Sequence, residues 1–371
     1  MFDIVTTIVL YNAVFLIAFI LCSKAEKMKK RNYVFWAYFL VTALSALRYD
    51  IGADYDGYAR VIESIVNDFH QNGLNIFVLY MGLKGMEPAI VLMSIFFSFT
   101  SEPLAWVVAA YSVLMMVLVY YALDKYSAHK WGLFLFFITS LMFSVWDTMR
   151  QGLAIAILLN CLPLIKERRI IKFACTVIIA TLVHYSSFLF AIVYIFAYFQ
   201  VSRKIAISIC LFFFGLAEVG VLSSLNGFFV SIAPYFSDFY SVDSLNTTYT
   251  YTDLSYIFNA LWLTFLIYLL PREENILANI IMVGALLHII AGGILHVDRI
   301  GYYFSAYQLI ALPLVLKYKR LEWKKIAIAA CVFALFSLNN IRILAQTYKG
   351  CSPYETIFSS EFQRKQFRDD Y

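Results

Sequence analysis

Apolar segments long enough to cross a lipid bilayer recur along the whole chain. Of its 371 residues, 62% are hydrophobic and only 14% are charged, whereas soluble domains carry about 45–50% apolar and about 25% charged residues. A transmembrane helix needs roughly 20 predominantly apolar residues. We therefore predict an all-α polytopic membrane protein with about twelve transmembrane helices. The predicted spans are residues 3–22, 33–47, 105–123, 131–145, 148–165, 170–183, 186–200, 205–222, 254–270, 276–294, 300–316 and 325–341.

The first of these segments resembles a span more than a signal peptide. It contains an acidic residue, Asp3, and no basic residue precedes its apolar core. Secretory signal peptides begin with a basic region and end at a small-residue cleavage site. We expect segment 3–22 to be retained.

The positions of lysine and arginine predict the side on which each loop lies. Three short loops, 23–32, 166–172 and 317–325, are rich in these residues. They should be cytoplasmic, because basic loops tend to remain on that side of the membrane. This orientation places 19 of the 29 basic residues in the cytoplasm and puts both termini outside.

The apolar stretch 88–100 does not fit this orientation as a full span. Loops 23–32 and 166–172 share a side only if an even number of spans separates them, and 88–100 would make that number odd. The stretch is bounded by Glu87-Pro88 and by Ser101-Glu102-Pro103. We expect a re-entrant or interfacial element, because irregular backbone at membrane depth is tolerated where it is buried or lines a cavity.

We expect one integral membrane domain, residues 1–371, with three longer external segments. These are a loop at 48–104 that includes the re-entrant element, a loop at 223–252, and a C-terminal tail at 342–371. The loop at 223–252 contains eight Phe and Tyr residues and no Lys or Arg. Its rings suit either an aromatic belt at the membrane surface or a platform for the faces of sugars.

Three arginines lie at predicted outer ends of spans, against the usual bias. They are Arg48, Arg150 and Arg299. Each has a simpler explanation by itself, because an arginine stem can snorkel and Asp147 can pair with Arg150 at a spacing of three residues. Together on one face they favour a polyanion, since the planar guanidinium can bind phosphate oxygens through two hydrogen bonds. Arg150 also opens a span, where the helix dipole attracts an anion.

His184 and Asp54 are the candidate proton acceptors on the same face. His184 lies in a tight external turn, and imidazole titrates near neutral pH, although a lone histidine is more often structural. Asp54 and Asp56 lie in the first external loop. Their spacing also suits a metal-binding pair, but hard cations need more oxygen ligands than these two.

The sequence predicts no cofactor. Its six cysteines show neither a C-x-x-C motif nor a Cys/His ligand spacing, so a structural metal site is not expected. It also has no Walker or dinucleotide-binding motif. Neither a bound metal nor a nucleic-acid partner is expected.

Short motifs follow one another in a defined order along nearly the whole chain. They are Arg48…Gly52-x-Asp54-Tyr55-x-x-Tyr58, Glu87-Pro88, Arg150-Gln151-x-x-Ala154, His184-Tyr185-Ser186, Arg299…Tyr303-Phe304 and Ser352-Pro353-Tyr354. In this order they resemble the EpsG family, bacterial membrane proteins grouped with Wzy-type polysaccharide polymerases. One departure is Ala53, where the family often has a small polar residue.

The resemblance implies a polymerase of a surface polysaccharide in the bacterial cytoplasmic (inner) membrane, active on the external or periplasmic face. The growing glycan would leave undecaprenyl pyrophosphate and join the next lipid-linked repeat unit. Its partners would be this lipid-linked oligosaccharide, the lipid bilayer, and a chain-length regulator and a flippase of the same pathway. The implied catalytic residues are His184 and Asp54, and the implied residues for substrate or pyrophosphate binding are Arg48, Arg150, Arg299, Tyr55, Tyr58, Glu87, Gln151 and Tyr303.

Two other functions remain open at this point. The chain could be a glycosyltransferase that uses a lipid-phosphate sugar, with Asp54 and Asp56 holding a divalent cation. It could also be a flippase or transporter of a lipid-linked oligosaccharide. A flippase needs charged groups distributed through the depth of the membrane, whereas the unusual charges here cluster at the outer face, which favours the polymerase.

Overall fold

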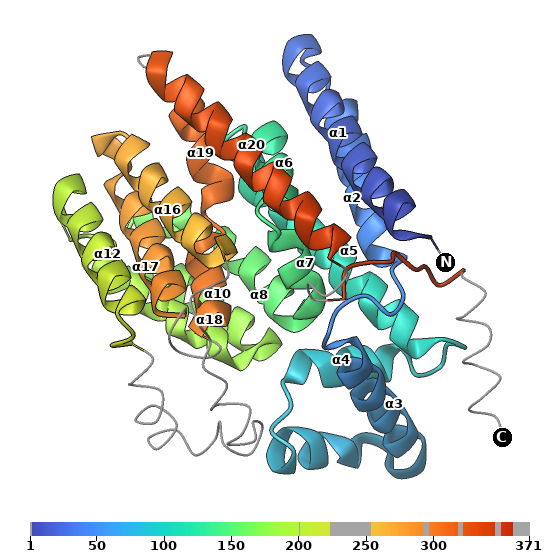
Figure 1. Ribbon diagram of the computed structural model, residues 1–371. Coiled ribbons are helices and arrows are strands. Elements are labelled where there is room, and N and C mark those ends of the chain that lie inside the picture. Colours follow the sequence, from blue (N-terminus) through green and yellow to red (C-terminus); the bar gives the residue numbers. More distant parts are fainter. Residues whose placement is uncertain are drawn as a thin grey trace. The chain divides into compact units, whose positions relative to one another are not determined.

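The computed structural model describes residues 2–199, 201–222, 254–291, 297–317, 322–345 and 350–358 (Figure 1). All regular secondary structure in these residues is helical, which confirms the all-α prediction. The chain forms two compact units. The first unit comprises Met1–Leu164, Ile171–Phe188 and Val332–Tyr371, and the second comprises Ile165–Ile170 and Leu189–Cys331.

The first unit is built from the N-terminal helices and the end of the last one. The helix α1 packs against α2 and α6, and α5 packs against α2 and α8. Apolar side chains fill these contacts, as in the stacked pair Phe15 and Phe137, whose ring centroids are 4.5 Å apart. The elements are α1 (Ile4–Met28), α2 (Asn32–Ala46), α3 (Tyr55–Asn72), η1 (Gly73–Asn75), η2 (Val78–Leu83), α4 (Pro88–Phe97), α5 (Pro103–Asp124), α6 (His129–Ile138), α7 (Leu141–Asp147), α8 (Met149–Leu159), the first residues of α9 (Leu162–Lys166), α10 (Ile170–Val183) after its first residue, the first part of η3 (Tyr185–Ile192) and the latter part of α20 (Glu322–Leu344). The remaining residues of these elements belong to the second unit.

The second unit is organised around α17 (Asn275–Ala291), which packs against α12 (Arg203–Glu218), α16 (Leu254–Leu269) and α18 (Val297–Ser305). A Cβ atom on Gly284 of α17 would lie 2.7 Å from the Ser305 amide nitrogen, so α17 and α18 are close enough that only glycine fits there. The unit also contains α11 (Val193–Phe196), η5 (Arg272–Glu274) and α19 (Gln308–Lys317). The predicted aromatic loop 223–252 lies outside the described residues.

Five helices in the described residues are long and apolar enough to cross a membrane. They are Ile4–Met28, Pro103–Asp124, Met149–Lys166, Arg272–Ala291 and Trp323–Leu344, and each overlaps a predicted span. The pair α6 and α7 makes a sixth if it counts as one bent span. Other predicted spans form shorter apolar helices, such as the 15-residue α2. A helix of that length rises about 22 Å, against roughly 30 Å for the bilayer core, so the number of twelve spans stays a prediction.

The predicted span 131–145 is broken between α6 and α7, whose axes are bent by 66°. Ser140 at the break has a φ of 58°, a left-handed conformation that is uncommon outside glycine. Its hydroxyl donates to Asn339 Oδ1 at 2.8 Å and accepts from Arg342 Nη1 at 2.8 Å. Polar side chains of α20 therefore form hydrogen bonds to the residue at the break. Irregular backbone at membrane depth is tolerated where it is buried in protein in this way.

The predicted loop 48–104 contains an 18-residue amphipathic helix, α3, that we did not predict. Its buried residues are Tyr55, Tyr58, Ile62 and Ile65. They lie at positions i, i+3, i+7 and i+10, so they share one face of the helix. This face packs on α4 and α5.

The stretch predicted to be re-entrant or interfacial begins with α4. Glu87 before it is extended, with a φ of −67° and a ψ of 141°, and Pro88 takes the first helical turn. Proline favours both features, because it restricts the preceding residue to extended backbone and fits the start of a helix. The ten residues of α4 rise about 15 Å, which is too short to cross a bilayer core alone.

Within the predicted tail 342–371, residues 342–344 belong to α20, and residues 350–358 contact the rest of the first unit. Thr356 forms an isolated antiparallel bridge with Arg48, and the Tyr354 hydroxyl donates to the Leu44 carbonyl oxygen at 2.7 Å. These contacts attach the end of the described chain to the end of α2. Residues 359–371 lie outside the described residues.

Candidate functional site

Three segments of the first unit meet at the side chain of Glu87. Glu87 precedes α4, and its side chain is only 5% exposed. Arg150 reaches it from the first turn of α8, and His184 reaches it from the residue that follows α10. We call Glu87, Arg150 and His184 the Glu87 cluster.

Both oxygens of the Glu87 carboxylate have partners. His184 Nδ1 lies 2.7 Å from Oε1, and Arg150 Nη1 forms an ion pair with Oε2. The backbone amide of Tyr185 also donates to Oε1, at 3.4 Å. An ionised carboxylate can only accept hydrogen bonds, so His184 Nδ1 is the donor and carries a proton.

The surroundings of Glu87 favour its ionised form. Burial raises the pKa of this carboxyl. The hydrogen bond from His184 and the positive charge of Arg150 together lower the pKa by more than burial raises it, so the pKa of Glu87 lies below its usual value. Glu87 is therefore a carboxylate at neutral pH. The Glu87 cluster then has no net charge when His184 is neutral and one positive charge when His184 is protonated.

The imidazole of His184 is held on one side and accessible on the other. Its backbone amide donates to the Ala180 carbonyl oxygen at 2.9 Å, which closes the last turn of α10. The side chain is 26% exposed, and Nε2 forms no hydrogen bond within the described residues. With the proton on Nδ1, the lone pair of a neutral ring lies on Nε2 and can accept a proton.

Arg150 lies between Glu87 and the aromatic face of α3. Its guanidinium carbon is 5.4 Å from the centroid of the Tyr58 ring, a distance typical of a cation–π contact. Tyr58 is buried, and burial raises the pKa of its hydroxyl although Arg150 opposes the shift. The Arg150 side chain remains 25% exposed, so part of it can reach a ligand.

Asp54 immediately precedes α3, one turn before Tyr58. The Tyr58 amide donates to the Asp54 carbonyl oxygen at 3.0 Å. The amide of Asp54 in turn donates to Asp147 Oδ1 at 3.1 Å. Asp147 is 4% exposed at the end of α7, so its carboxylate ties the start of α3 to the turn that presents Arg150.

Arg48 has a different environment from the one we expected. It is 2% exposed, and its Nη1 donates to the Ser45 carbonyl oxygen at 2.5 Å and to Ser112 Oγ at 2.7 Å. Its guanidinium carbon lies 5.5 Å from the Trp146 ring centroid. These contacts join α2, α5 and α7 and favour a structural role, so the predicted contact with pyrophosphate stays a prediction.

The remaining predicted residues fall in two places. Tyr55 and Gln151 are buried in the first unit, Tyr55 with its ring 5.7 Å from Tyr49 and Gln151 in the first turn of α8. Arg299 and Tyr303 lie on α18 of the second unit, where Tyr303 is fully buried. The predicted grouping of Arg299 with Arg48 and Arg150 stays a prediction.

Two features of the site were not read from the sequence. We considered Asp147 as the partner of Arg150, whereas the structure pairs Arg150 with Glu87, which lies 63 residues earlier. We also gave Tyr185 no role, but its hydroxyl donates to the Met86 carbonyl oxygen at 3.0 Å. The dipeptides His184-Tyr185 and Met86-Glu87 therefore bind to each other. The motif order contains Glu87 and His184-Tyr185 but not Met86, so it indicated these residues without their contact.

The described residues bring together no group of three or more His, Cys, Asp or Glu side chains that could hold a metal ion. Asp56, the second member of the suggested metal-binding pair, is exposed on α3. Its carbonyl oxygen accepts a hydrogen bond from Arg60 Nε at 3.3 Å.

Comparisons with known proteins agree with the motif order. The model of the EpsG family matches residues 31–356, which is most of the chain. No curated protein and no solved structure matches. The family match extends from the α1–α2 turn to the folded part of the tail and includes every residue of the Glu87 cluster. The chain belongs to the EpsG family.

Proposed function

We propose that the protein is a polymerase of a surface polysaccharide, acting on lipid-linked repeat units. The EpsG family suggests an exopolysaccharide-related polymerase. The observation that carries the proposal further is the Glu87 cluster, in which a buried carboxylate holds both a partly exposed histidine and a partly exposed arginine. Such a cluster can accept a proton next to a charge that attracts phosphate.

In the proposed reaction a hydroxyl of the incoming repeat unit attacks the anomeric carbon of the growing glycan. A new C–O bond forms there as the bond from that carbon to undecaprenyl pyrophosphate breaks. His184 Nε2 takes the proton of the hydroxyl, and the leaving pyrophosphate takes the electron pair. A glycosyl pyrophosphate is already activated, so the transfer needs no further cofactor.

The charges of the Glu87 cluster suit this reaction. When His184 takes up the proton, the net charge of the cluster rises from zero to one positive charge, and Glu87 stabilises the imidazolium. This positive charge develops as negative charge develops on the leaving group, and such complementary electrostatics is a large contribution to catalysis. We therefore propose that Glu87 is a positioning residue for His184 and does not itself bind pyrophosphate.

The other predicted residues keep the proposed roles that the resemblance implies. Asp54 is the alternative base, and Arg150 and Arg299 are the proposed contacts to pyrophosphate. Arg48, Tyr55, Tyr58 and Gln151 are buried in the first unit, so we propose that they shape the site, with direct substrate contact as the alternative. Tyr303, which is buried in the second unit, keeps the substrate contact that the resemblance implies as its proposed role.

We further propose how the protein lies in the membrane. The shorter apolar helices would complete about twelve spans in the bacterial inner membrane, with the Glu87 cluster on the outer face. The lipid-linked repeat unit would be undecaprenyl-pyrophosphate-linked and would reach that face through a flippase of the same pathway. A chain-length regulator is a further proposed partner.

Two other functions are alternatives to this proposal. A lipid-phosphate-sugar glycosyltransferase would use Asp54 and Asp56 with a divalent cation, and a flippase would move the lipid-linked unit without changing it. The Glu87 cluster favours a reaction over transport, because a partly exposed imidazole aligned by a carboxylate is suited to proton transfer.

The test is to supply the purified full-length protein with a lipid-pyrophosphate repeat unit and to separate the products by size. The proposal predicts a ladder of products that differ by one repeat unit. It also predicts that the ladder persists in EDTA. Loss of the ladder in EDTA with rescue by Mg²⁺ or Mn²⁺ would favour the metal-dependent glycosyltransferase. Movement of unmodified lipid between leaflets without a ladder would favour the flippase.

A further inference from the structure

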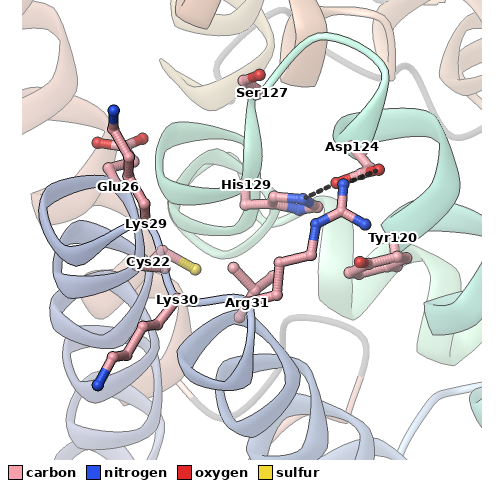
Figure 2. Close-up of a pocket in the computed structure, with 11 residues that line it drawn as sticks. Cys22, Glu26, Lys29, Lys30, Arg31, Tyr120, Asp124, Ser127 and His129 are labelled. Carbon is pink, nitrogen blue, oxygen red and sulfur yellow. Dashed lines mark hydrogen bonds and ion pairs between the residues drawn. The ribbon is translucent and has the colours of Figure 1, made fainter.

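A cavity of about 260 Å³ lies in the first unit, at the end of α1 that is predicted to face the cytoplasm. It forms where the turn between α1 and α2 meets the loop between α5 and α6. Figure 2 shows Arg31 reaching across it toward Asp124 and His129, with Lys29 and Lys30 on the side of α1. None of these residues takes part in the Glu87 cluster.

The two carboxylates that line the cavity already have cationic partners. Glu26 Oε2 lies 2.7 Å from Nζ of Lys130. Asp124 Oδ1 lies 3.1 Å from His129 Nε2, and its Oδ2 lies 3.5 Å from Arg31 Nη2. The negative charge of the lining is therefore balanced before Lys29 and Lys30 are counted.

Lys29 and Lys30 leave the cavity with a positive surplus. Both are exposed, and neither forms an ion pair or side-chain hydrogen bond within the described residues. The Arg31 side chain is 81% exposed and holds Asp124 only through the 3.5 Å contact, and exposed pairs of this kind contribute little energy. Lys29 and Lys30 can therefore turn toward an anion without leaving a carboxylate of the lining unpaired, and the weak contact to Asp124 leaves Arg31 able to contact the same anion.

An exposed aromatic surface adjoins the cationic end. Phe35, Trp36 and Phe39 in the first turns of α2 are 61%, 52% and 51% exposed. Their rings contact one another, with centroids 5.4 Å apart for Phe35 and Trp36 and 5.5 Å apart for Trp36 and Phe39. Aromatic side chains of this kind are enriched where a membrane protein meets the lipid headgroups. The occupant of the cavity should therefore combine an anionic group with hydrocarbon chains.

We propose that this cavity binds the phosphate of an anionic membrane phospholipid, with the acyl chains lying along the exposed face of α2. Basic pockets between transmembrane helices on the cytoplasmic side bind such headgroups. Free phosphate could contact the same cations, but it would make no use of the aromatic surface. The proposal is independent of the function of the Glu87 cluster.

The test measures lipid binding by the purified full-length protein in a neutral detergent, using native mass spectrometry. The probes are phosphatidylglycerol, zwitterionic phosphatidylcholine and inorganic phosphate. We expect one phosphatidylglycerol to be retained per chain, in preference to phosphatidylcholine and in the presence of excess inorganic phosphate. The double variant K29Q/K30Q should bind phosphatidylglycerol about 25-fold more weakly, because each lysine beside a lipid phosphate contributes roughly fivefold in affinity.

The matched control is K24Q/K27Q, which removes the same charge from the same end of α1. Lys24 and Lys27 are exposed and do not line the cavity, so this variant should bind phosphatidylglycerol as the parent does. An equal loss in both double variants would overturn the proposal in favour of diffuse attraction to a basic loop. Equal retention of phosphatidylcholine by the parent protein, or displacement of phosphatidylglycerol by inorganic phosphate, would overturn it as well.

Discussion

At the scale of single residues, Glu87 determines which chemistry is open to His184. The hydrogen bond to the carboxylate keeps a proton on Nδ1, so Nε2 is the nitrogen that can accept another. The same carboxylate stabilises the imidazolium that results, as an aspartate does for the histidine of a serine protease. A histidine without the carboxylate would have neither a fixed proton on Nδ1 nor a stabilised imidazolium. The pair of Glu87 and His184 therefore indicates proton transfer more strongly than the lone histidine in the sequence does.

His184→Gln should lower the turnover of polymerisation by about a hundredfold or more, the usual effect of losing a general base. Binding of the donor lipid should be unchanged, because glutamine keeps a polar side chain of similar size. The measurements are donor binding and polymer length for the purified variant. The control is His70→Gln, because His70 lies outside the Glu87 cluster and contacts the Ser98 carbonyl oxygen at 3.2 Å. Normal polymerisation by His184→Gln would transfer the role of base to Asp54.

Glu87→Gln should remove a pH-dependent part of the stability. The pKa of Glu87 is lower in the folded protein than the ordinary value of a glutamate, about 4.5, so ionised Glu87 stabilises the fold above about pH 4.5, and this stabilisation is lost as the pH falls further. The difference in melting temperature between the parent and Glu87→Gln should be largest at neutral pH and should become smaller as the pH falls below about 4.5. Glu63→Gln, which changes an exposed carboxyl on α3, should show no such difference.

Arg48→Lys should distinguish a structural arginine from one that binds substrate. Lysine keeps the charge but cannot make the same contacts to Ser45, Ser112 and the Trp146 ring, so we expect a lower melting temperature. Donor affinity per folded molecule should stay within about twofold of the parent value. A stable variant whose donor affinity falls by tenfold or more would instead support the predicted contact of Arg48 with pyrophosphate.

At the scale of elements, the turn between α7 and α8 sets the position of Arg150. A Cβ atom on Gly152 would lie 2.7 Å from Val145 Cβ and 2.9 Å from the Val145 carbonyl oxygen. Both atoms belong to α7, every residue of which is buried. Neither helix can move away easily, so the absence of a side chain at this position allows α8 to begin where Arg150 meets Glu87.

Gly152→Ala should therefore lower both stability and polymerisation. Inserting a methyl group into a packed contact is typically destabilising by about 1–3 kcal/mol, and any shift of α8 moves Arg150 away from Glu87. Thermal unfolding and the product ladder would measure the two effects. Gly57→Ala is the control, because a Cβ atom at Gly57 on α3 would meet nothing within 4 Å. Equal behaviour of the two variants would contradict this account of the turn.

The elements also show how far the sequence could predict the structure. Long apolar runs such as Pro103–Asp124 were found, because length and hydropathy are local properties. The break at Ser140 was missed, because it depends on Asn339 and Arg342, which lie about two hundred residues away. The helix α3 was missed because its apolar spacing was read as part of a loop. At the site, the motif order supplied the residues of the Glu87 cluster, but the ion pair between Glu87 and Arg150 is a tertiary contact with no local signal.

At the scale of the whole molecule, the orientation in the membrane decides whether the proposed reaction is possible. The cytoplasmic assignment rests on the basic loops, and the outer position of the Glu87 cluster follows only if an even number of spans separates loop 23–32 from loop 166–172. Two observations bear on that number. The helix α4 is too short to cross alone, and α6 and α7 form a bent pair that either crosses once or returns to the same side.

Cysteine labelling of intact cells should resolve the orientation. The parent for this test is a chain in which all six native cysteines are replaced, so that only the introduced thiol can react. Asn72→Cys lies at the end of α3 and Arg169→Cys lies in the basic loop before α10, and both positions are exposed. We expect a membrane-impermeant maleimide to label position 72 in intact cells and position 169 only after permeabilisation. Labelling of position 169 from outside would contradict the orientation. If both positions reacted from the same side, the number of crossings between residues 72 and 169 would differ by one from the predicted number. The segment 88–100 would then be the first to reconsider, because such a change moves the Glu87 cluster away from the face where the polymer must grow.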